Sequence, residues 1–220
     1  VKNGRIMREG VYDEVDVQPA ANDAGTALGG CYWLWNTVMR KPRKYIFEHA
    51  YLGPAWSDEQ YERAICQEIK SKHLVEIEKV KDAPSLAASM LSDGKIIGWF
   101  QGRMEFGPRA LGSRTIIGDA RSPEMQKTMN LKIKYRESFR PFAPSIREEN
   151  ISEYFDIDRP SPYMLLVADV KKDKQIPMTS EQESYFGLQK LNIPRSQVPA
   201  ITHVDYSARI QSVNKNTNER

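Results

Sequence analysis

The chain has 220 residues, of which 40% are hydrophobic and 28% charged, and its formal net charge is +3. This composition is typical of a folded, soluble chain with a sizeable core and excludes intrinsic disorder. No apolar run approaches the roughly 18 residues of a membrane helix, and the first residues lack the apolar core of a signal peptide. Cys31 lies on an apolar helical pattern, so we expect a buried, reduced thiol and a cytoplasmic protein.

The first fifty residues predict a short strand and one long helix. Residues 15–17 alternate as in a strand, and apolar residues recur at helical spacing over residues 22–38. Glycines such as Gly25 weaken this helix, and we expect them to allow close approach of backbone or ligand. Asp23 at the helix start fits equally an N-cap and a carboxylate directed at a metal or a sugar hydroxyl.

Further along the chain, helix starts are marked by capping residues: Ser57 with its capping-box partner Gln60, Asp82, and Ser122. Strand patterns cover residues 73–80, 95–100, 114–118, 162–170, 202–205 and 208–213. The run over 95–100 is continuously apolar, which indicates burial on both faces. Residues 171–197 are polar and poorly periodic, which is typical of a mobile excursion or lid. Helices followed by buried strands predict a layered α/β domain.

Positive charge is concentrated between Gln101 and Arg147. This stretch holds ten Lys and Arg residues against four Asp and Glu, and glycines and aromatic residues interrupt it. Glycine and proline in the first part of the stretch prevent regular structure and free backbone N–H groups to face an anion. A compact basic cluster favours a small polyanion, such as a nucleotide or acyl phosphate, over a general nucleic-acid surface.

The basic residues recur in two groups: Arg103, Arg109 and Arg114, then Lys134, Arg136 and Arg140. Planar guanidinium groups donate paired hydrogen bonds to phosphate oxygens, and several directed at one point stabilise a phosphoryl-transfer transition state without a protein nucleophile. The alternative is that the basic residues form surface ion pairs with nearby acids, which we expect for Arg121, Lys127 and Arg147.

Two motifs carry a family resemblance. The run Gly-Arg-Met-Glu-Phe-Gly-Pro-Arg-Ala-Leu-Gly-Ser-Arg over 102–114, followed by Asn130-x-x-x-Lys134-x-Arg136-Glu-Ser-Phe-Arg140-Pro-Phe-Ala-Pro144, resembles the C-terminal region of NodU/CmcH-type O-carbamoyltransferases. Residues 18–25 resemble the end of that family's Kae1-like domain, and residues 202–209 its later nucleotide-site strand. Tyr206 stands where the family usually has glycine.

The resemblance implies a fold with two parts. Residues 51–220 are expected to form an α/β domain with a YrdC-like twisted open sheet and flanking helices. Residues 1–50 are expected to be a remnant of an ASKHA-type, Kae1-like domain. The chain is expected to be a fragment that begins inside the first domain and stops before the family's later Asn-Thr-Ser-Phe-Asn segment.

The resemblance also implies an activity. The parent enzyme would bind carbamoyl phosphate and ATP with Mg²⁺, form a carbamoyl-adenylate, and pass the carbamoyl group to a hydroxyl of a small-molecule or glycoside acceptor. The Kae1-like domain would hold a divalent metal, with iron as the first choice. Neither membrane nor nucleic acid is implied as a partner, and a homodimer is left open.

Site residues follow by position from the same resemblance. The implied catalytic residues are Arg109, Arg114, Lys134 and Arg140; the implied ligand-binding residues are Arg103, Arg136, His203, Asp205 and Arg209. Asp23 matches a metal ligand whose partner histidines lie upstream in the family. Two alternatives stay open: a threonylcarbamoyl-adenylate synthase or hydrogenase-maturation carbamoyltransferase, and a non-catalytic nucleotide- or RNA-binding module.

Overall fold

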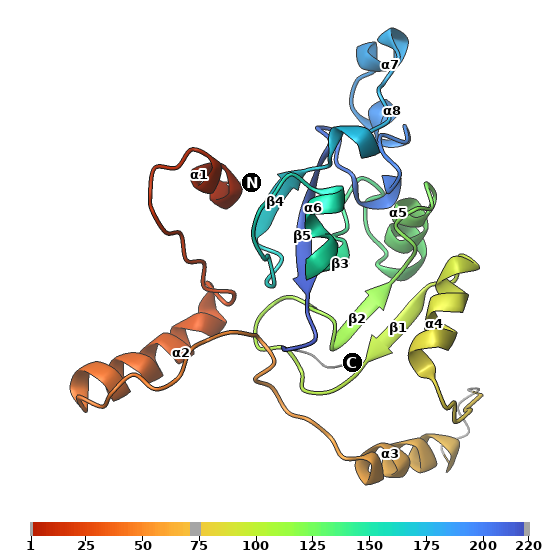
Figure 1. Cartoon of the computed structure of the whole chain (residues 1–220). Helices are drawn as coiled ribbons and strands as arrows, with labels where there is room; N and C mark the ends of the chain where they lie inside the picture. Colours follow the sequence, from red (N-terminus) through yellow and green to blue (C-terminus); the bar gives the residue numbers. More distant parts are fainter. Residues whose placement is uncertain (1, 71–75, 218–220) are drawn as a thin grey trace.

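The computed structural model describes residues 2–70 and 76–217, and two small β-sheets lie at its centre (Figure 1). In the first sheet, β1 (Ile97–Phe100) pairs antiparallel with β2 (Arg114–Ile117). The second has the order β3-β5-β4, with β3 (Ser145–Arg147) parallel and β4 (Leu166–Asp169) antiparallel to β5 (Ser207–Val213). The mixed α/β class is therefore confirmed, while the YrdC-like topology and the Kae1-like remnant stay predictions.

Helices surround these sheets. The α-helices are α1 (Lys2–Arg8), α2 (Asp23–Tyr32), α3 (Asp58–Lys70), α4 (Ala83–Ser92), α5 (Met125–Thr128), α6 (Ile151–Tyr154), α7 (Ser180–Ser184) and α8 (Leu188–Leu191). Two π-helical segments, η1 (Trp33–Val38) and η2 (Met129–Ile133), continue α2 and α5, and 3₁₀ turns occupy η3 (Glu148–Asn150), η4 (Lys172–Lys174) and η5 (Pro199–Ile201). No helix in the described ranges is both long and apolar enough to cross a membrane.

The core lies around β5, which has a neighbour on each edge. Its buried side chains are Phe155, Ala168, Val170, Ile201, Ala208 and Ile210. A second cluster forms where Met125 and Met129 of the α5–η2 segment pack on Ala200. The two methionines are buried, whereas Ile133 at the end of η2 is exposed.

Local capping chemistry explains two helix starts. Ser57 and Gln60 exchange hydrogen bonds at the start of α3. The Gln60 side chain accepts from Ser57 N–H at 2.8 Å, and the Ser57 hydroxyl accepts from Gln60 N–H at 3.4 Å. Asp82 accepts from Ser85 N–H at 3.0 Å at the start of α4, and Gly94 follows its end with φ +78°. Both predictions are confirmed. For α2 the cap is Asn22 rather than Asp23, and α5 begins at Met125 without a side-chain cap at Ser122.

Several predicted strands are wrong. Residues 15–17 and 76–80 have no regular structure, and residues 73–75 of the strand predicted over 73–80 lie outside the described ranges. Residues 202–205 form a turn after η5, because His203 N–H donates to the carbonyl of Ser207. The strand within 95–100 is present as β1, but Phe100 is 49% exposed because β1 has only one neighbour in the described structure.

The first fifty residues are not packed as one unit. Helix α1 lies on β4, so closely that a Cβ on Gly4 would come within 2.6 Å of the Val167 carbonyl oxygen. Helix α2 and η1 extend away from the sheets (Figure 1) and contain no buried residue. Cys31 is an exposed free thiol, which corrects the prediction of a buried one. The domain division at residue 50 stays a prediction.

Candidate anion-binding site

The loop between β1 and β2 is folded around the buried carboxylate of Glu105. One carboxylate oxygen accepts hydrogen bonds from the backbone N–H groups of Leu111 (2.6 Å) and Ser113 (2.9 Å). The other accepts from Nε of Arg114 at 3.0 Å, and the Glu105 residue is only 4% exposed. Arg114 is therefore neutralised by its neighbour, and its guanidinium also donates to the Glu105 and Gly107 carbonyls.

Further contacts fix this loop to the rest of the molecule. The Leu111 carbonyl accepts from Nε2 of Gln211 at 2.6 Å and from the Tyr51 hydroxyl at 2.9 Å. Arg103 donates to the carbonyls of Leu52 and Gly53, both at 2.9 Å. Its position therefore gives Arg103 a tethering role and directs its guanidinium away from a common centre with the other arginines.

The second basic turn is folded around Asn130, whose residue is fully buried. The Asn130 amide donates to the carbonyls of Ser138 (3.1 Å) and Arg140 (2.8 Å), and its oxygen accepts from Nε of Arg136 at 2.6 Å. The Arg136 guanidinium also lies over the Phe142 ring, 4.9 Å from its centroid. Both contacts hold the plane of this guanidinium in place.

Three arginines converge from different parts of the chain: Arg109 from the first turn, Arg136 from the second, and Arg209 from β5. Burial, followed by the nearby charges of Arg109 and Arg136, lowers the pKa of Arg209 below its ordinary value. Within residues 2–70 and 76–217 none of the three forms an ion pair with a carboxylate, and Nε of Arg109 is buried without a hydrogen-bond partner. The exposed carboxylate of Glu137 lies near enough for Arg136 to help lower its pKa, but it pairs directly with Arg140. Like charges gathered without a directly paired carboxylate favour an anionic ligand.

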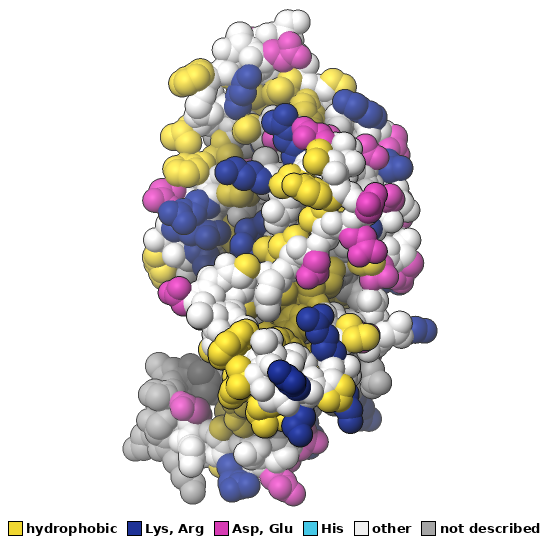
Figure 2. Space-filling model, turned by 90° about the vertical axis from the view of Figure 1, so that its left-hand side faces the viewer, with side chains coloured by type: hydrophobic (Ala, Val, Ile, Leu, Met, Phe, Trp, Pro, Cys, Tyr) yellow, Lys and Arg dark blue, Asp and Glu magenta, His cyan; other side chains and the backbone are white. Residues whose placement is uncertain are grey.

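Basic side chains cluster on part of the molecular surface. Figure 2 shows several Lys and Arg side chains, in dark blue, close together at one side of the upper half of the displayed face, many Asp and Glu side chains toward the opposite edge of that half, and further Lys and Arg side chains scattered over the lower half. Such clustering produces a local positive potential although the net charge of the chain is small.

His203 and Asp205 are joined through Ser207 at the start of β5. The Ser207 hydroxyl donates to Asp205 at 2.7 Å and lies 2.9 Å from Nδ1 of His203, so Nδ1 carries the proton and donates to Ser207. Nε2 of His203 is buried without a partner among the described residues. It is therefore a bare hydrogen-bond acceptor.

Burial and neighbouring charges decide the protonation of this group. Burial is the main reason why the pKa of His203 lies below its ordinary value, and Arg209 and Arg195 lower it further against the opposing effect of Asp205. Burial alone would raise the pKa of Asp205, but the hydrogen bonds from Ser207 outweigh burial and keep that pKa low. We therefore expect a neutral imidazole beside an ionised carboxylate at neutral pH.

Arg195 holds the backbone at His203 in place. This arginine is 2% exposed and donates to the carbonyls of His203 (3.1 Å), Thr202 (3.3 Å) and Lys190. Burial lowers its pKa. The sequence analysis missed Arg195 and the organising roles of Glu105 and Asn130. Only the last two carry a sequence signal, because both lie inside the two family motifs.

The remaining predicted residues lie apart from this cluster. Lys134 is exposed at the end of η2, and Arg140 pairs with the exposed Glu137 at 2.8 Å. Arg121 and Arg147 form the expected surface pairs with Asp119 and Glu149, whereas Lys127 is in no ion pair among the described residues.

The predicted metal ligand lies away from any group that would complete its site. Asp23 is exposed in the first turn of α2. The described ranges contain no group of three His, Cys, Asp or Glu side chains able to hold a metal ion. The described residues therefore do not fit a complete metal site.

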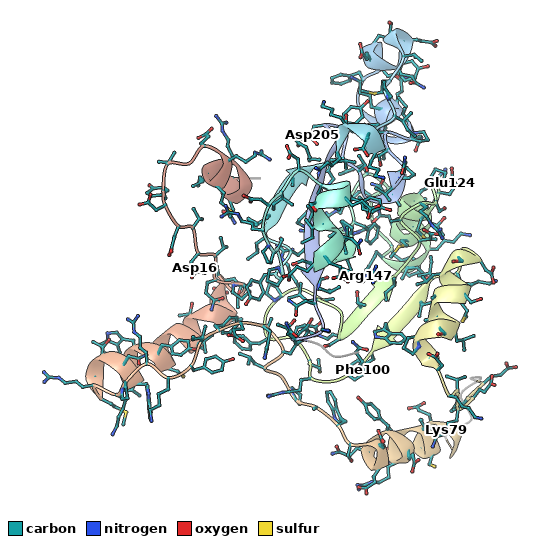
Figure 3. The ribbon with its side chains drawn as sticks, in the orientation of Figure 1. Asp16, Lys79, Phe100, Glu124, Arg147 and Asp205 are labelled. Atoms are coloured by element: carbon teal, nitrogen blue, oxygen red, sulfur yellow. The ribbon has the colours of Figure 1, made fainter. Side chains whose placement is uncertain are left out.

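A cleft of about 930 Å³ lies between the two sheets. Leu111 and Gly112 of the first basic turn line it together with Arg147 of β3, which is labelled in Figure 3. Arg109, Arg136 and Arg209 do not line it. Because charge rather than volume selects a phosphate, we place the candidate anion site at the three arginines.

Comparison with known proteins shows the family to which the chain belongs. The sequence model of the family described as Carbamoyltransferase C-terminus matches residues 88–220, which include both basic turns and β5. The chain belongs to this family.

Three relatives of the carbamoyltransferase family illustrate the range of identity. An uncharacterized protein of Synechocystis sp. is 50% identical over the whole chain and 36% of its own length. Nodulation protein NolNO of Sinorhizobium fredii is 37% identical over 99% of this chain and 29% of its own length. The 3'-hydroxymethylcephem-O-carbamoyltransferase of Streptomyces clavuligerus is 30% identical over 98% of this chain and 35% of its own length. The chain thus spans about a third of these curated relatives.

Proposed function

We propose that this chain is the part of an ATP-dependent O-carbamoyltransferase that binds carbamoyl phosphate and ATP and forms a carbamoyl-adenylate. The observation that carries the proposal is the convergence of Arg109, Arg136 and Arg209 without paired carboxylates in a member of the carbamoyltransferase family. In the longer protein the carbamoyl group then passes to an acceptor hydroxyl.

The chemistry requires two anions to meet. Water first cleaves the bond between the carbamoyl group and its phosphate, which releases inorganic phosphate and leaves carbamate. A carbamate oxygen then attacks the α-phosphorus of ATP, the bond from that phosphorus to the bridging oxygen of the β-phosphate breaks, and pyrophosphate leaves. Both reactants are negatively charged, so their mutual repulsion opposes the encounter. Fixed guanidinium groups screen that repulsion and stabilise the charge that develops on the transferred phosphoryl group.

His203 adds a different kind of recognition. A phosphate offers only hydrogen-bond acceptors at neutral pH, whereas the carbamoyl group also carries an NH₂ donor. The bare Nε2 of His203, beside Arg209, is a neutral acceptor for such a donor. Guanidinium donors together with one neutral acceptor match both ends of carbamoyl phosphate.

The remaining predicted residues receive secondary roles in this proposal. Arg114 and Arg103 hold the first turn in shape, while Lys134 and Arg140 are surface cations that attract the anionic substrates from solution. ATP would bring Mg²⁺ with it. Asp23 would join a metal site only with residues from elsewhere in the longer protein.

The decisive assay is carbamoyl-phosphate-dependent release of pyrophosphate from ATP by the full-length protein. We expect Arg109→Ala and Arg136→Ala each to reduce that release at least tenfold, since each removes a charged hydrogen-bond donor. Arg121→Ala, at an exposed arginine paired with Asp119, is the matched control. ATP-independent transfer, or RNA binding with a steep salt dependence and no nucleotide affinity, would overturn the proposal.

A further inference from the structure

We propose that Asn130 is a positioning residue that fixes Arg136 for an anion without cancelling the arginine's charge, an inference that rests on the proposed function of the arginine cluster. Asn130 is fully buried, and its side-chain oxygen accepts from Nε of Arg136 at 2.6 Å. It therefore contacts the arginine and not the proposed site of the ligand.

The orientation of the Asn130 amide is determined by its surroundings. Its nitrogen donates to the carbonyls of Ser138 and Arg140, which are acceptors only. A reversed amide would place the side-chain oxygen against these carbonyls and its nitrogen against the Arg136 guanidinium, which has no acceptor. Every hydrogen bond of the buried amide thus serves to hold the turn and present its oxygen to Nε of Arg136.

The contact between Asn130 and Arg136 is distinguished by the neutrality of its acceptor. In the first turn the carboxylate of Glu105 also holds a guanidinium, but it pairs with the charge of Arg114. An amide oxygen accepts the same kind of hydrogen bond and brings no negative charge. With Nε bound to Asn130 and the guanidinium plane over Phe142, the two terminal nitrogens of Arg136 keep their fork of donors for a phosphate.

The test is titration calorimetry of the full-length protein with inorganic pyrophosphate. Asn130→Asp keeps the size of the side chain and the oxygen that faces Arg136, adds a negative charge, and replaces the donor to the Ser138 and Arg140 carbonyls with an acceptor. We expect pyrophosphate affinity to fall on the order of 10- to 100-fold, the effect of losing a hydrogen bond to a charged group. Asn192→Asp, at an exposed asparagine after α8, adds the same charge and is expected to leave the affinity unchanged.

A double-mutant cycle separates positioning from general damage. In an Arg136→Ala background, Asn130→Asp has no guanidinium left to neutralise, so we expect little further loss of affinity. Arg136→Lys keeps the charge and removes the planar fork, and it tests the same point without altering the buried asparagine. We expect it to weaken pyrophosphate binding by about tenfold.

Three results would overturn the inference: wild-type affinity in Asn130→Asp or in Arg136→Lys, losses that multiply in the double variant, or no pyrophosphate binding by the wild-type protein. A different result would refute the proposed function. If pyrophosphate binds in an Asn130-dependent manner but carbamoyl phosphate causes no pyrophosphate release from ATP, the adenylate reaction is wrong and the role of Asn130 stands.

Discussion

The two basic turns are built around the same kind of hydrogen bond, but the acceptor is charged in one turn and neutral in the other. Each is folded around one buried polar side chain that accepts from the Nε of an arginine: Glu105 in the first turn and Asn130 in the second. The carboxylate is a full counter-charge, so Arg114 acts as an internal brace. The amide carries none, so Arg136 stays cationic beside Arg209.

This difference shows that arginines within a single motif have separate roles. An arginine whose charge is already balanced contributes to shape, and one held by a neutral acceptor keeps its charge for a ligand. The distinction predicts opposite consequences for variants of the two kinds, and the following experiments test it in order of decreasing effect.

The largest effect is expected at Glu105. Glu105→Ala removes the acceptor of the Leu111 and Ser113 N–H groups and leaves Arg114 without its counter-charge. We expect a loss of about 2–4 kcal/mol in the free energy of unfolding, measured by denaturant titration of the full-length protein. Glu149→Ala, at an exposed surface pair, serves as control. A loss below about 1 kcal/mol at Glu105 would mean that the carboxylate does not hold the turn.

A smaller effect of opposite sign is expected at Arg209. Arg209→Met removes a half-buried cation that Arg109 and Arg136 repel, so we expect stability to rise by about 1 kcal/mol. The same variant should lose pyrophosphate affinity. Thermal unfolding and calorimetry on one preparation measure both changes. A marked drop in stability would show that Arg209, like Arg114, is part of the framework.

The acid side of the stability profile depends on His203, whose pKa is lowered chiefly by burial. Below its ordinary value of about 6.5 the unfolded chain binds more protons at this histidine than the folded chain, so stability falls as the pH drops through that value. We expect His203→Gln to flatten the dependence of Tm on pH between about 5 and 6.5. An unchanged slope in the variant would remove His203 as its source.

The smallest effect on stability is expected at Arg140. Its pair with Glu137 is exposed on both sides, and such pairs contribute little. We expect no measurable change in the unfolding midpoint for Arg140→Ala and a reduced rate of pyrophosphate release. If stability falls instead, Arg140 belongs with the bracing residues of the first turn.

What the sequence predicted well was local. The caps at Ser57 and Asp82 depend on hydrogen bonds within a few residues, and these predictions are confirmed. Gly25 also meets its expectation, because a Cβ there would lie 1.9 Å from the Ala20 carbonyl oxygen. No such neighbour exists at Gly29 or Gly30.

The errors have both distant and local causes. The apolar run of β1 indicated burial on both faces, but burial depends on neighbouring strands that the run itself does not encode. Residues 202–205 have strand-like residues, yet the hydrogen bond from His203 to Ser207 turns the chain there. The meeting of Arg209 with Arg109 and Arg136 likewise comes from tertiary packing and has no signal in residue spacing. The family motifs supplied these arginines as candidates, but not their proximity.

Ala20 links the start of α2 to the loop that carries Arg109. Gly107 of this loop has φ +122°, and a Cβ there would lie 3.5 Å from the Cβ of Ala20. Ala20 is itself fully buried, and a Cβ on Gly25 of helix α2 would lie 1.9 Å from its carbonyl oxygen. A larger side chain at any of these three positions would therefore push the start of α2 and the arginine-bearing loop apart.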